Sequence, residues 1–64
     1  MAHSSTSTIL RLPAVLARTG LARATIYAHI SQGSFPAPIK LGPRASGWVE
    51  AEVDGWVAAR IAAR

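Results

Sequence analysis

Apolar residues with helical spacing, interrupted by proline and glycine, predict a short helix near the start of this chain. The helix should begin at Leu12 or Pro13, because proline is favoured in the first helical turn, where its missing amide hydrogen is not needed. Val15 and Leu16 give it an apolar side. Gly20 is placed to end it, since glycine adopts the left-handed C-terminal conformation at little cost.

A second helix is predicted over residues 22–32. Leu21, Ile26 and Ile30 lie close to one face at helical spacing, and Gly33 supplies the stop. Two short helices joined by a turn that contains glycine are typical of a helix-turn-helix unit.

The chain then changes character, because prolines at positions 36, 38 and 43 exclude helix. The alternation of Ile39, Lys40 and Leu41 predicts a strand whose two apolar side chains face inward and whose lysine faces outward. Turn-forming residues follow, with Arg44 at or near the tip, and Trp48 and Val49 are expected in a return strand. We therefore expect a small β-hairpin.

A third helix is predicted from Glu50 to about Ala63. Four apolar residues recur along one stripe: Val53, Trp56, Val57 and Ile61. Carboxylates lie in the first turns, where the helix dipole favours them: Glu50, Glu52 and Asp54. Gly55 is its weak point, since glycine costs about 1 kcal/mol relative to alanine in an exposed helix.

These elements indicate one mainly α domain with a small β-hairpin, a winged helix-turn-helix of three short helices over residues 9–64. The polar residues 1–8 are expected to form a disordered tail. A chain of 64 residues has little apolar surface to bury, so both Trp48 and Trp56 are expected in the core.

The charge distribution favours a polyanionic partner. The chain has seven Lys and Arg against three Asp and Glu, a net charge of +4, and every acid lies at or after Glu50. Basic residues separated in this way from the acidic ones can form a positive part of the surface that binds nucleic acid. The alternative is that the high arginine and alanine content only reflects a GC-rich genome. The net charge alone does not decide between this alternative and a polyanionic partner.

Other classes of function find little support in the sequence. There is no cysteine, and the two histidines are not spaced as a metal site. The serines of the tail have no positioned base, and no phosphate-loop glycine pattern is present. We expect no enzyme activity, cofactor or small-molecule ligand. No apolar run is long enough for a membrane span, so a cytoplasmic protein is expected.

The outer face of the second helix is small and uncharged. With Ile26 at the centre of the buried face, a wheel of 100° per residue places Ala24, Ala28 and Ser31 opposite. A helix that faces only water usually carries charged side chains there. Alanines permit close approach to a large surface, and their methyl groups can contact thymine methyls in a major groove.

Eight residues are candidate DNA contacts: Arg23, Ala24, Thr25, Tyr27, Ala28, Ser31, Lys40 and Arg44. We expect Arg23, Thr25 and Tyr27 to reach phosphates from the helix edge, and the two basic residues of the hairpin to reach the backbone or a minor groove. Alternatives remain: Tyr27 can pack on the hairpin, and the basic side chains can serve only solubility.

Several short motifs together resemble a known family. They are Thr19-Gly20-Leu21, Thr25-Ile26-Tyr27, Gly33 with Phe35-Pro36-Ala37-Pro38, Lys40-Leu41-Gly42, Gly47-Trp48, and Glu52-Val53 with Trp56. In this order and spacing the chain resembles the AlpA family of small phage and prophage transcriptional regulators, winged-helix relatives of MerR-type and excisionase DNA-binding domains. The resemblance covers about residues 9–61. It implies a recognition helix at 22–32 and a wing at 39–48.

The sequence thus predicts a double-stranded DNA-binding transcriptional regulator of phage or mobile-element genes, monomeric in solution and able to bind cooperatively on DNA. Family members commonly have serine at positions 22 and 24 and a longer polar residue at 28. This chain has alanine at all three, which predicts modest base specificity. Two other hypotheses are an excisionase-like architectural DNA-binding factor and a protein-interaction module whose alanine face receives a partner.

Overall fold

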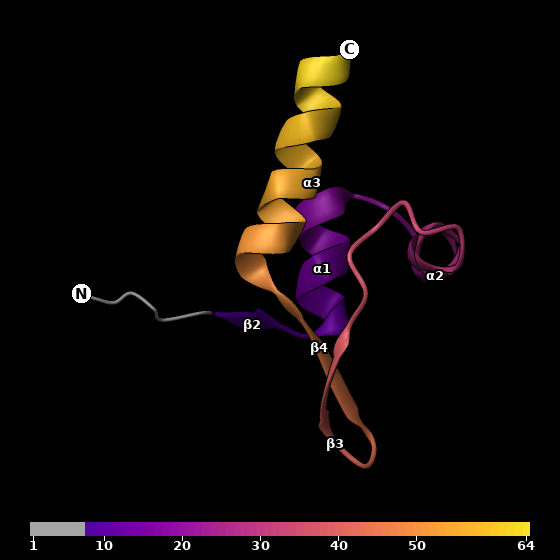
Figure 1. Ribbon diagram of the computed structural model, residues 1–64, viewed down its shortest axis with the longest axis vertical. Coiled ribbons are helices and arrows are strands. Elements are labelled where there is room, and N and C mark those ends of the chain that lie inside the picture. Colours follow the sequence, from indigo (N-terminus) through magenta and orange to yellow (C-terminus); the bar gives the residue numbers. More distant parts are fainter. Residues whose placement is uncertain (1–7) are drawn as a thin grey trace, which may run out of the picture.

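The computed structural model describes residues 8–64, which form three helices and a small antiparallel sheet (Figure 1). The elements in chain order are β2 (Ile9–Leu10), α1 (Leu12–Thr19), α2 (Arg23–Ser31), β3 (Ile39–Gly42), β4 (Ala45–Val49) and α3 (Glu50–Ala63). This architecture confirms the expected winged helix-turn-helix. The predicted tail lies outside the described residues except for Thr8, whose carbonyl accepts a hydrogen bond from the Glu50 amide at 2.8 Å.

Two glycines end the helices of the helix-turn-helix, as the sequence predicts. Gly20 has φ 72° and its amide donates to the Leu16 carbonyl at 2.8 Å, which closes α1. Gly33, just beyond α2, has φ 76°. Because other residues are strained at such angles, these two positions fix where the chain leaves each helix.

The wing is the predicted hairpin extended by a strand that the sequence analysis missed. Strand β4 lies between β3 and β2, and both pairings are antiparallel. In the pairing of β2 with β4, Leu10 lies opposite Trp48. Two residues are too few for a recognisable alternation, so β2 is defined by its partner β4 rather than by its own sequence.

The predicted facing of β3 is wrong. Ile39 and Leu41 are 42% and 45% exposed, although they were expected to face inward. Ile39 pairs with Gly47, the neighbour of the buried Trp48, so it lies on the sheet face that points away from the helices. The indole already fills the inner face. Lys40 pairs with Ser46 and therefore lies on that inner face, at its open end.

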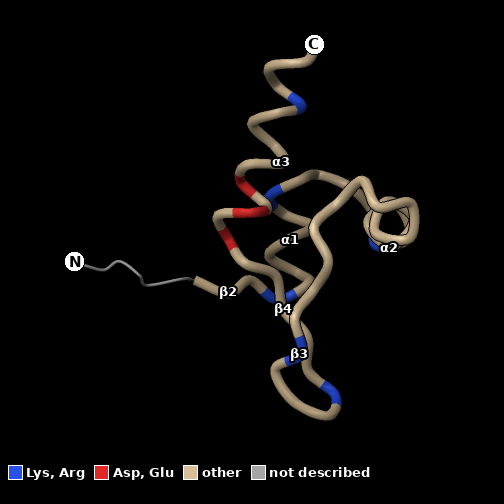
Figure 2. Tube along the Cα trace, viewed as in Figure 1, with Lys and Arg blue, Asp and Glu red and all other residues tan. Residues whose placement is uncertain are grey.

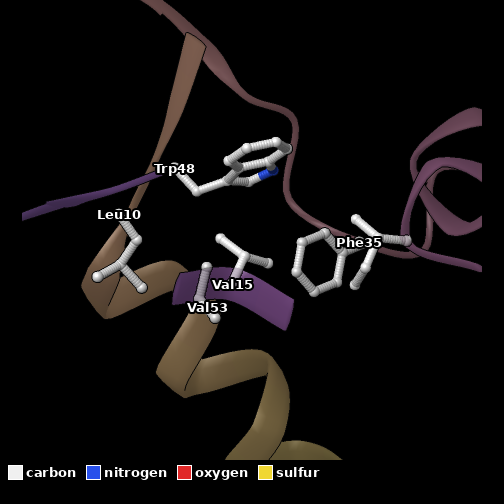
Figure 3. Packing of buried hydrophobic residues seen from close by; sticks show 6 residues of the cluster. Leu10, Val15, Phe35, Trp48 and Val53 are labelled. Atoms are coloured by element: carbon white, nitrogen blue, oxygen red, sulfur yellow. The ribbon is translucent and has the colours of Figure 1, made fainter. Parts of the chain in front are cut away.

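A core of six buried side chains joins the elements: Leu10, Val15, Ile26, Phe35, Trp48 and Val53 (Figure 3). Trp48 is only 1% exposed, and its indole N–H donates to the Pro36 carbonyl at 3.1 Å. The Phe35 ring meets Trp56 edge to face, with 5.0 Å between centroids. The predicted core positions of both tryptophans are confirmed, although Trp56 is only partly buried.

Helix α3 packs against α1 with its first half and extends beyond the core with its second (Figure 1). Val53 is fully buried, whereas Ile61, expected on the same apolar stripe, is 57% exposed. The predicted apolar stripe is buried at its start, but no residue among 8–64 covers its C-terminal end. No helix in this part of the chain is long and apolar enough to cross a membrane.

Replacing Gly55 by alanine should stabilise the fold. Gly55 lies inside α3, and a Cβ built there meets no atom within 4 Å. We expect Gly55→Ala to raise the free energy of unfolding by about 0.5–1 kcal/mol, measured by urea denaturation, because the unfolded chain loses freedom and nothing clashes. Gly20→Ala is the matched control. It should lower the same free energy by about 1–2 kcal/mol, since alanine is strained at positive φ. Equal effects of the two substitutions would contradict this account.

Candidate nucleic-acid interface

The outer face of α2 is open to solvent, as the helical wheel predicts. Ile26 is fully buried and holds α2 to the core, while Ala24, Ala28 and Ser31 on the other side are exposed. Thr25 is exposed as well. The helix carries no acidic residue in its first turn. Its outer face is therefore smooth and without negative charge.

Tyr27 connects this helix to the wing. Its ring meets the Trp48 ring edge to face, with 6.5 Å between centroids, and the Arg23 guanidinium lies 5.8 Å from the tyrosine ring centre. The side chain is nonetheless 42% exposed. Tyr27 thus packs on the hairpin, as the alternative interpretation held, and also presents a free edge beside Arg23.

A concave pocket of about 300 Å³ lies where α1, α2 and the wing meet. Its lining residues are Arg11, Leu12, Pro13, Arg23, Tyr27, Arg44, Ser46 and Trp48. Three of the predicted contacts, Arg23, Tyr27 and Arg44, come together here. Ala24, Thr25, Ala28 and Ser31 of α2 do not line it. Lys40 lies on the pocket's side of the sheet through its pairing with Ser46.

Arg11 is the lining residue that the sequence analysis missed. It precedes α1, and its exposed side chain joins two arginines that lie 12 and 33 residues further along the chain. A basic residue directly before a helix that begins with Leu-Pro gives no local sign of a shared site. Only the packing of α1 against the wing brings the three together.

The acidic residues lie on the first turns of α3 (Figure 2), and none of them lines this pocket. Within residues 8–64, ion pairs join only Arg18 to Glu50, at 2.6 Å, and to Asp54, at 2.7 Å. The hydrogen bonds that Arg18 donates to Glu50 and, next in size of effect, to Asp54 raise the pKa of its guanidinium. The carboxylates expected to serve the helix dipole therefore also neutralise Arg18, and they leave the arginines of the pocket without acidic partners in the described part of the chain.

A second pocket, of about 320 Å³, lies on the other side of α2 against α3. It is lined by Thr19, Leu21, His29, Trp56 and Arg60. His29 Nδ1 lies 3.0 Å from the Ser34 hydroxyl, and its ring centre lies 5.8 Å from that of Trp56, so it is a packed histidine. Among the residues that the structure describes, no three His, Asp or Glu side chains are grouped as a metal site requires.

Removing the Arg18 charge should weaken the fold through α3. We expect Arg18→Gln to lower Tm, measured by circular dichroism, because two ion pairs between α1 and α3 are lost. The difference from wild type should shrink at about 1 M salt, where exposed charges are screened. Arg44→Gln, which removes an arginine without a carboxylate partner, should not lower Tm. An unchanged Tm in Arg18→Gln would show that these ion pairs do not stabilise the fold.

The chain is similar to a family of prophage regulatory proteins and to proteins of E. coli and of a phage. Residues 8–61 match the family described as prophage CP4-57 regulatory protein (AlpA). The chain is 46% identical to the DNA-binding transcriptional activator AlpA of Escherichia coli strain K12, over 94% of each chain. It is also 46% identical to uncharacterized protein ORF88 of Enterobacteria phage P4, over 86% of this chain and 62% of that protein.

Proposed function

This chain belongs to the AlpA family of prophage regulatory proteins, and we propose that it binds double-stranded DNA with a sequence preference and regulates transcription of prophage or mobile-element genes. The observation that carries the proposal is the surface made by α2 and the wing. An exposed, uncharged helix face lies beside arginines that have no acidic partner in the described chain. The relative from E. coli is named for DNA binding and transcriptional activation, which favours the same function here.

The dimensions suit α2 to the major groove. An α-helix with its side chains is about 10–12 Å in diameter, and the major groove of B-DNA is about 12 Å wide. Ala24, Ala28 and Ser31 would face the base edges, because they lie opposite the buried Ile26. Short side chains let the helix backbone approach closely but provide few hydrogen bonds, so sequence preference would be modest.

The flanking side chains would hold the backbone. Arg23 and Thr25 lie at the start of α2, Tyr27 is one turn further, and Arg44 is in the wing turn beyond Lys40. Guanidinium and ammonium groups bind phosphate oxygens regardless of base sequence. We further propose that the protein is cytoplasmic, monomeric in solution and able to bind DNA cooperatively.

DNA binding should depend strongly on salt. If about three or four phosphates are contacted, the slope of log affinity against log salt concentration should be near −3 to −4. The measurement is fluorescence anisotropy with a duplex selected from a random pool and with a scrambled duplex. Both should give similar slopes, and the selected duplex should bind more tightly. Absence of binding to any duplex would refute DNA binding, a flat salt dependence would refute the phosphate contacts, and a pool without a consensus would refute sequence preference.

A carboxylate on the outer face of α2 should abolish binding. Ala28→Glu places a negative charge against the DNA, and we expect affinity to fall at least about 100-fold, because close like charges cost several kcal/mol. The control is Ala62→Glu, which makes the same change at an exposed position near the end of α3. It should weaken binding much less. Circular dichroism should show both variants folded, and unchanged affinity in Ala28→Glu would place the interface elsewhere.

A further inference from the structure

The pocket between α1, α2 and the wing gathers positive charges that no acidic side chain balances within residues 8–64. Arg11 precedes α1, Arg23 is the first residue of α2 and Arg44 lies in the wing turn, and all three line one concavity of about 300 Å³. Like charges held around a shared space repel one another. No carboxylate lines this pocket, since the acids of the chain lie on α3.

We propose that this pocket receives a single phosphate group of the DNA backbone, held by the three arginines. The inference rests on the proposed function and extends it, because it adds Arg11 to the DNA-contacting residues and assigns one phosphate to a defined place. The lining chemistry fits such a group. Each guanidinium presents five N–H donors in a planar arrangement that matches phosphate oxygens, and the Ser46 hydroxyl can donate as well.

The uncharged residues of the pocket lining strengthen and position the three arginines. Leu12, Pro13 and the buried Trp48 supply apolar walls, next to which an ionic contact is screened less than on an open surface. The aromatic ring of Tyr27 supports Arg23 from 5.8 Å and itself rests on Trp48. The position of Arg23 is thus tied to the core.

The position of the pocket gives the phosphate a particular role. Arg23 belongs to the recognition helix and Arg44 to the wing, so a phosphate bound to both lies between the two parts of the interface. Phosphate contacts fix the register and orientation of a protein on the duplex. A phosphate held from three segments would set how α2 enters the groove relative to the wing.

Arg11→Gln tests the inference without altering the core, because Arg11 is exposed and its side chain makes no cap to α1. We expect affinity for every duplex to fall about ten-fold at low salt and the salt slope to become shallower by about 0.9. The matched control is Arg64→Gln, which removes the same charge at the end of α3, outside the pocket. It should change affinity less than about three-fold.

A second measurement identifies the phosphate itself. In a selected duplex, single phosphates are replaced in turn by neutral methylphosphonates. At one position, neutralisation should weaken wild-type binding and should cost less in Arg11→Gln, because the contact between Arg11 and that phosphate is already lost while Arg23 and Arg44 still contact it. At other contacted positions the two losses should add. Additive losses at every position would overturn the inference.

The outcomes separate this inference from the proposed function and from a soluble ligand. Wild-type protein that binds no duplex overturns both proposals. Wild-type protein that binds DNA while Arg11→Gln behaves like Arg64→Gln overturns the pocket alone. Titration with inorganic phosphate, followed through arginine N–H resonances, supports the pocket if Arg11, Arg23 and Arg44 shift and duplex competes. Binding of inorganic phosphate together with duplex affinity unaffected by Arg11→Gln would assign the pocket to a soluble phosphate compound instead.

Discussion

The burial of Trp48 is the interaction on which the other parts of this structure depend. The indole is 1% exposed, donates its N–H to the Pro36 carbonyl and packs against Tyr27. Burying an aromatic side chain removes about 150–250 Å² from water, about 4–6 kcal/mol. A chain of 64 residues has a total stability of about 3–10 kcal/mol. One side chain on β4 therefore decides whether α2 and the wing stay together.

The placement of Trp48 also determines what the two faces of the small sheet do. Because the indole fills the inner face, Ile39 and Leu41 are left on the outer face, and Lys40 is turned to the side of the pocket. The same ring forms part of the pocket wall. Trp48 thus belongs both to the core and to the pocket wall, so a substitution of Trp48 would alter both.

Charge segregation is the second organising feature. Arg18 points to α3 and is held by Glu50 and Asp54, while the arginines of the pocket have no such partners in the described residues. Three carboxylates gathered in one short stretch of α3 would otherwise lower the positive potential over the whole of a small protein. Because they lie on α3, α2 and the wing carry basic residues and no acidic ones (Figure 2).

The sequence by itself determined the elements and their ends, because these depend on local chemistry. Helical spacing of apolar residues, a proline at the start of α1 and glycines after α1 and α2 act within a few residues, and the observed bounds agree with them. The exposed outer face of α2 followed from the same periodicity. The motifs also pointed to the AlpA family, which the comparisons confirm.

Only the tertiary structure decided the strand β2, the facing of β3, the role of Arg18 and the inclusion of Arg11 in a shared pocket. Three of these features depend on a partner more than 30 residues away in the chain: β4 for β2, α3 for Arg18, and the wing for Arg11. The facing of β3 depends on which side chain fills the inner face of the sheet first. A local pattern predicts the conformation of a segment, but the side that it buries and the charges that it meets are set by the segments packed against it.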